Sequence, residues 1–76
     1  MNFVCGDLLV HENYSQWMRY TPEEKINELC PEQTARRFVV PGDMMLVISV
    51  DQTTGFLLVL CKNGYGWLHS AGQQRV

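Results

Sequence analysis

The sequence predicts a mainly β domain, a small five-stranded barrel that carries a helix-containing insertion between its first two strands. Three observations support this fold class. Two long runs of apolar, β-prone residues follow each other in the second half of the chain. A Pro-Gly-Asp turn precedes them, and an Asn-Gly corner follows them. Between about residues 12 and 38, charged residues become frequent and β-branched residues become sparse, which indicates an insertion.

The size of the chain predicts one domain over residues 1–76 with a thin core. A chain of 76 residues buries only about 60 to 65% of the surface that it exposes when unfolded. Hydrophobic residues make up 46% of the chain, which is typical of globular proteins rather than disordered ones. No window approaches the roughly 20 apolar residues of a membrane span. We therefore expect a cytoplasmic protein without a membrane segment.

Charge and cysteine content exclude further classes. The formal net charge is −2, and the densest basic spot is the pair Arg36-Arg37 beside Glu32. Because nucleic-acid binding usually needs several phosphate contacts, we do not expect a nucleic-acid partner. The three cysteines, Cys5, Cys30 and Cys61, include no closely spaced pair, which argues against a disulfide framework.

The first predicted strand lies within residues 4–11 and begins with a turn at Gly6-Asp7. The same pattern, a Gly-Asp turn followed by three apolar residues, recurs at residues 40–46. Glycine tolerates a positive φ, and aspartate bonds to nearby backbone amides. We favour shared turn chemistry over an internal duplication, because nothing downstream of the two turns continues the match.

The insertion contains a helix start. Thr21 is placed as an N-cap, Pro22 at the first helical position, and Glu24 to reach back as in a capping box. Three apolar residues then share one face at helical spacing: Ile26, Leu29 and Cys30. The sequence therefore predicts a helix over residues 22–30, which ends before Pro31.

Two strands follow the turn at Pro41-Gly42, which suits a type II turn. The first is predicted over residues 44–50 and the second over residues 56–61, with a polar loop at 51–55 between them. Both strands are apolar on both alternations, so both faces of the sheet need a cover. The predicted helix is one candidate. The other is a homodimer through the sheet, with four interface residues: Met45, Val47, Leu57 and Val59.

With these segments in place, the chain resembles the SH3-like barrels. Gly42-Asp43 and the strand after it match the family's diverging turn and second strand, and the insertion occupies the place of the long RT loop. Residues 56–70 look like the third and fourth strands, and residues 74–76 like the last short strand. More closely, the chain is similar to small single-domain barrels from tailed phages and marine environmental genomes. That resemblance implies a phage-encoded accessory or host-interaction protein, acting in the host cytoplasm.

The chain departs from the peptide-binding signalling domains of the family. It lacks the Ala-Leu-Tyr-Asp-Tyr motif at its start and has Phe56 where those domains have a Trp. His69 and Gly72 stand near the positions of the family's terminal Pro and Tyr. The resemblance therefore does not imply recognition of proline-rich peptides, which needs an aromatic-lined groove.

Aromatic residues form the candidate binding site. They are enriched in binding hot spots and supply contact area at low entropic cost. The candidates come from the insertion and from the end of the chain: Tyr14, Trp17, Tyr20, Tyr65, Trp67 and His69. The structural alternative is that Trp17 and Trp67 anchor the insertion to the barrel.

No residue set predicts a metal site, a cofactor or a catalytic centre. Cysteine and histidine ligands of structural zinc usually come in closely spaced pairs, and the sequence has none. The cysteines at 30 and 61 lie in apolar segments, where thiols act as small hydrophobes. We therefore expect a non-enzymatic protein-interaction module. The alternative is single-stranded nucleic-acid or ribonucleoprotein binding through the same aromatics.

Overall fold

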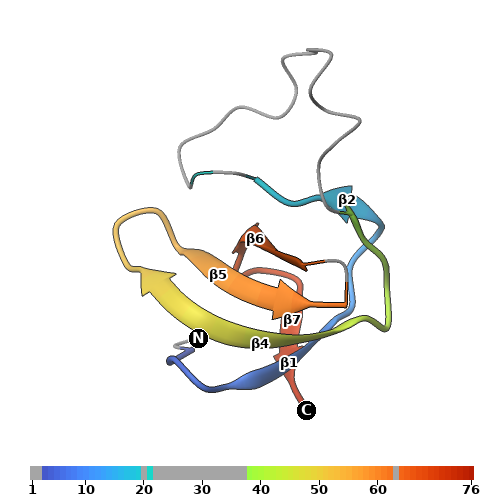
Figure 1. The fold of residues 1–76 in the computed structure, drawn as a ribbon, viewed down its shortest axis with the longest axis horizontal. Coiled ribbons are helices and arrows are strands. Elements are labelled where there is room, and N and C mark those ends of the chain that lie inside the picture. The colour runs from blue at the N-terminus through green and yellow to red at the C-terminus, as the bar shows by residue number, and fades with distance from the viewer. Residues whose placement is uncertain (1–2, 20, 22–37, 63) are drawn as a thin grey trace.

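A computed structural model describes residues 3–19, 21, 38–62 and 64–76, and these residues form a mainly β structure. The main sheet has five antiparallel strands in the order β6-β5-β4-β1-β7 (Figure 1). Its strands are β1 (Leu8–His11), β4 (Met44–Asp51), β5 (Phe56–Cys61), β6 (Gly64–His69) and β7 (Gln73–Arg75). A second pair consists of β2 (Gln16–Trp17) and β3 (Phe38–Val39). The described ranges contain no helix, and so none long and apolar enough to cross a membrane.

Most of the predicted strands are confirmed. β5 has the predicted bounds, β4 continues one residue further to Asp51, and β7 begins at Gln73 instead of residue 74. The helix predicted over residues 22–30 lies outside the described residues. The sequence predicted only a helix in the insertion, but the structure has a short strand near each of its ends. There Gln16 pairs with Val39, and Trp17 pairs with Phe38.

β1 lies between β4 and the edge strand β7, so segments far apart in sequence are neighbours in the sheet (Figure 1). On one side Leu9 is opposite Met45, and on the other it is opposite Arg75. The backbone N–H of Val76 donates to the carbonyl of Leu8 at 2.9 Å, which continues the pairing to the end of the chain. The sheet therefore joins the beginning and the end of the chain.

The core lies on one face of the main sheet, and it contains the four residues that the sequence suggested for a dimer interface. Its buried apolar residues are Phe3, Leu9, Met18, Val39, Met45, Val47, Leu57, Val59 and Leu68. Met45, Val47, Leu57 and Val59 are at most 1% exposed and pack inside this core, so they are not available to a second subunit. Because successive side chains of a strand point to opposite faces, the outward residues are their neighbours.

The repeated Gly-Asp motif forms two turns of the same construction, at residues 4–7 and 40–43. In each turn the aspartate N–H donates to the valine carbonyl three residues earlier at 3.1 Å. The aspartate Oδ2 in return accepts the N–H of that valine, at 2.9 and 3.0 Å. The glycines have φ values of +95° and +94°, which favours glycine at both positions.

The two turns close the β1–β4 ribbon at opposite ends. At one end Val47 donates its N–H to the carbonyl of Asp7 at 2.9 Å, and at the other His11 donates its N–H to the carbonyl of Asp43 at 2.9 Å. The glycine N–H of each turn donates to the carbonyl of the same partner, at 2.8 Å in both cases. The ribbon is therefore held in register at both ends by equivalent bonds.

Candidate functional site

The start of the insertion is attached to the edge strand β6. Arg19 and Trp67 exchange two backbone hydrogen bonds of 2.9 Å, each N–H donating to the other residue's carbonyl. Gly66 makes this approach possible, because a Cβ at its position would lie 2.7 Å from the Cβ of Met18. Met18 is buried in the core. The absence of a side chain at Gly66 therefore positions residues 14–19 next to β6.

A pocket of about 370 Å³ opens between this segment and the strands β5 and β6. We call it the aromatic pocket. It is lined by Tyr14, Ser15, Gln16, Arg19, Phe56, Trp67, Leu68 and His69. Four of these side chains are aromatic rings, counting the imidazole, and they come from three separate segments of the chain.

One wall of the aromatic pocket is a stack of three side chains. Phe56 begins β5 and lies opposite His69 in the register, and the two rings meet edge to face with centroids 5.1 Å apart. The guanidinium of Arg19 lies 4.5 Å from the centroid of the Phe56 ring, within the range of a cation–π contact. This packing fixes the position of a positive charge at the pocket.

The rim of the pocket is held by a buried histidine. The Nε2 of His11 lies 2.9 Å from the carbonyl oxygen of Tyr14, and its Nδ1 lies 2.9 Å from Oε1 of Gln73. The Gln73 amide nitrogen donates to the carbonyl of His69 at 3.2 Å, which orients the amide with its oxygen towards the ring. Both ring nitrogens therefore face oxygen atoms, and the imidazole links the segment at Tyr14 to β7.

The structure brings three of the six predicted binding residues together. Tyr14, Trp67 and His69 all line the aromatic pocket. Tyr65 shares the outer face of β6 with Trp67 and His69 but lies outside the lining. Of the other two, Trp17 belongs to β2, and Tyr20 lies outside the described residues.

The sequence did not single out Phe56 and Arg19 as binding residues. Phe56 had a signal, because the resemblance to the SH3-like barrels places it at the position of their Trp. Arg19 had none, because it joins the site only through its backbone pairing with Trp67. The sequence also carried no signal for three further lining residues, which the fold brings to the pocket: Ser15, Gln16 and Leu68.

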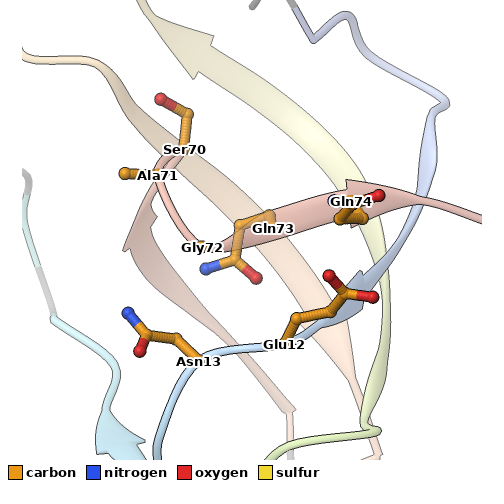
Figure 2. A pocket seen from close by; sticks show the side chains of 7 residues that line it. All are labelled: Glu12, Asn13, Ser70, Ala71, Gly72, Gln73 and Gln74. Atoms are coloured by element: carbon orange, nitrogen blue, oxygen red, sulfur yellow. The ribbon is translucent and has the colours of Figure 1, made fainter.

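A second, larger pocket of about 580 Å³ lies at the turn between β6 and β7 (Figure 2). Figure 2 shows its lining, which consists of Glu12 and Asn13 after β1 and residues 70–74 of the turn. The amide of Gln73 already bonds to His11 and His69, and Oδ1 of Asn13 accepts the N–H of Tyr14 at 2.9 Å. Its lining offers no aromatic anchor, so the smaller aromatic pocket is the better candidate for binding.

Both histidines and Cys61 make hydrogen bonds. The bonds of His11 are given above, and Nδ1 of His69 accepts the N–H of Ala71 at 3.1 Å. The Cys61 thiol donates to the carbonyl of Gly64 at 3.2 Å, and Cys5 is exposed. Among the residues that the structure describes, no three His, Cys, Asp or Glu side chains gather as metal ligands would.

Comparisons with protein-family models, with curated proteins and with solved structures find no match to this chain. The candidate site is therefore assigned from its own geometry.

Proposed function

We propose that this chain is a non-enzymatic protein-interaction module, which holds an extended segment of a partner protein in the aromatic pocket. One observation supports this above all others: Tyr14, Trp67 and Phe56 meet Arg19 in a single open pocket. Tyrosine, tryptophan and arginine are the residues most enriched among binding hot spots. Arg19 already packs on the Phe56 ring, so little ordering of these two side chains is needed on binding.

We also propose that the main sheet belongs to an SH3-like barrel. The strand order supports this, because β1 lies between the strand after the 40–43 turn and the last strand. Gly42 takes a positive φ where the resemblance places the diverging turn. Arg19, near the start of the insertion, pairs with β6. In the sequence, the insertion lies between the first strand and the 40–43 turn, where the resemblance has the long RT loop.

The lining suggests the chemistry of the ligand. Arg19 is the one lining residue that always bears a charge, and no described lining residue is a carboxylate. An acidic group on the ligand is therefore favoured by electrostatic complementarity. Phe56 and Trp67 provide the apolar surface beside it. We infer that the preferred segment combines an apolar or aromatic side chain with a neighbouring aspartate or glutamate.

The proposal is tested with peptides of about ten residues selected from a displayed library, a length that covers an extended recognition segment. We expect Trp67→Ala to weaken the best peptide by more than about tenfold, which is about 1.4 kcal/mol. Tyr65→Ala is the matched control, since Tyr65 is an exposed aromatic residue of the same strand outside the pocket. Circular dichroism confirms that both variants fold. Equal affinities of the wild type and Trp67→Ala would contradict the proposal.

A second candidate function is the binding of single-stranded nucleic acid. The contact between Arg19 and the Phe56 ring favours it, because single-strand binders combine stacking rings with cations. Titration with an oligothymidylate separates the two functions. Nucleic-acid binding predicts an affinity that falls steeply with salt concentration. The protein-interaction proposal predicts selection of acidic peptides and no measurable oligothymidylate binding at physiological salt.

A further inference from the structure

The exposed outward side chains of β1 and β4 and one of β5 are aliphatic, whereas the solvent-facing side of an antiparallel sheet is normally polar. On β4 the outward residues Met44, Leu46 and Ile48 are 39 to 50% exposed. Leu8 on β1 and Leu60 on β5 are exposed to a similar degree, at 44% and 43%. Five large aliphatic side chains thus face solvent from three neighbouring strands.

The strand register places several of these residues in one row. Leu8 is opposite Leu46, and Leu46 is opposite Leu60. Leu60 is in turn opposite Tyr65, which is 55% exposed. The row crosses β1, β4, β5 and β6 without a charged residue. We call the row and its neighbours the outer face: Leu8, Met44, Leu46, Ile48, Leu60 and Tyr65.

The charges closest to the outer face in sequence are compensated. Lys62, shortly after Leu60, lies 3.2 Å from a carboxylate oxygen of Asp43. Asp7, next to Leu8, lies 3.1 Å from the guanidinium of Arg75. No residue of the outer face itself is charged. Two copies of this face therefore do not repel each other, and nothing on it selects a charged partner.

The area of the outer face decides what can cover it. Together its side chains form a patch of roughly 500 Å², at the upper end of the largest apolar patches that monomers expose, which are often functional. Two facing copies would remove roughly 1,000 Å², the lower limit for a specific interface. We propose that a second copy of this chain docks on the outer face in a symmetric, sheet-on-sheet dimer.

This dimer uses a different set of residues from the one that the sequence suggested. The buried residues of β4 and β5 form the core of each copy, and their outward neighbours form the interface. The six residues named for the dimer do not line the aromatic pocket, although Tyr65 lies on the same side of β6 as Trp67. An interface of this size is weak, so the dimer forms at concentrations in the micromolar range or above.

Sedimentation equilibrium over about 5 µM to 1 mM tests the proposal, since an interface at the lower size limit dissociates within such a range. We expect the apparent mass of the wild type to rise with concentration from 8.8 kDa towards twice that value. Leu46→Lys places a charge at the centre of the face and should keep the protein monomeric throughout. Tyr14→Lys is the control, because Tyr14 is 72% exposed and lies outside the face. It should dimerise as the wild type does.

A wild type that stays monomeric at every concentration overturns the proposal and leaves the outer face to another partner. A Leu46→Lys variant that is folded and still dimeric also overturns it. Should Leu46→Lys fail to fold, Leu8→Lys on the neighbouring strand replaces it, with the same expected loss of the dimer. Trp67→Ala, which tests peptide binding, should dimerise normally. Loss of peptide binding and loss of the dimer are thereby distinguishable.

Discussion

Asp7 and Asp43 each stabilise a turn with a carboxylate that accepts a backbone N–H and meets a cation. The backbone hydrogen bond is the main cause that lowers the pKa of both aspartates, although burial acts in the opposite direction. Arg75 lowers the pKa of Asp7 further. Lys62 and, more weakly, His11 lower that of Asp43. Both turns therefore favour the ionised carboxylate.

We predict that acid destabilises the fold through these two aspartates. A lowered pKa in the folded state gives stability that is complete above the unfolded value of about 3.9, and this stability is lost as the pH falls through the lower folded pKa. The urea midpoint should therefore drop below about pH 4. In the double variant Asp7→Asn/Asp43→Asn the drop should be smaller. Glu12→Gln, which removes a carboxylate outside the turns, is the control, and an unchanged profile in the double variant would contradict the prediction.

His11 and His69 form a matched pair, and we expect their substitutions to differ in the size of the stability loss. His11 is fully buried and bonds through both ring nitrogens, whereas His69 is exposed. His11→Leu leaves the buried Oε1 of Gln73 without its hydrogen-bond partner, so we expect a loss of about 2 to 4 kcal/mol in the free energy of unfolding. His69→Ala should cost less than about 1 kcal/mol. Urea denaturation measures both, and similar losses would show that the His11 bonds contribute little.

At the scale of elements, the contact between the insertion and β6 depends on one glycine. In Gly66→Ala the new methyl group would meet Met18, so residues 18–19 must move away from β6 and the aromatic pocket must change shape. We expect a loss of about 1 to 3 kcal/mol in stability, together with weaker peptide binding. Backbone chemical shifts of Arg19 and Trp67 report the displacement.

Gly6→Ala is the control for this change. Gly6 has a φ of +95° and open space around it, so alanine there adds backbone strain of about 1 to 2 kcal/mol without a clash. It should destabilise the protein while leaving the Arg19 and Trp67 shifts unchanged. The same shift changes in both variants would mean that the pocket responds to stability alone.

The elements that the sequence predicted best are those with long local patterns. β4 and β5 are continuous apolar runs between turn residues, so their positions followed from the sequence. The two-residue strands β2 and β3 have no periodicity, and they pair across 20 intervening residues. The inner face of β4 was also undetermined, because both of its alternations are apolar. The register shift between Val47 and Ser49 likewise depends on the partner strand.

The candidate site was predictable to a similar degree. Tyr14, Trp67 and His69 were identified from their residue types, which need no structure. The contacts of Phe56 depend on its register with His69, and those of Arg19 on its pairing with Trp67. Both pairings join segments distant in sequence, and no local pattern specifies them.

At the scale of the whole molecule, the last strand holds the first in place. β7 pairs with β1 along its length and contributes the buried side chain of Gln73. Without β7, the fully buried Leu9 would lie on an exposed sheet edge. The fold therefore depends on a contact between residues at opposite ends of the sequence.

We predict that deletion of residues 73–76 removes the cooperative unfolding transition. Small domains have a total stability of about 5 kcal/mol or little more, and the deletion removes a strand, a buried amide and the Arg75 ion pair together. Urea denaturation followed by circular dichroism should show no sigmoidal transition. Gln74→Ala, at an exposed position of β7, should retain it. A truncated chain that unfolds with an unchanged slope against urea would contradict this prediction.

The two Gly-Asp turns have a geometric consequence for the β1–β4 ribbon. A shift of 36 residues along the chain carries one turn onto the other, and the pairing of Leu9 with Met45 lies midway between them. Rotation by half a turn about that pair exchanges the two strands together with their turns. The ribbon thus has the symmetry of two identical short peptides bound to each other, although one chain supplies both. Each turn therefore makes the same backbone bonds to the strand that the other turn precedes.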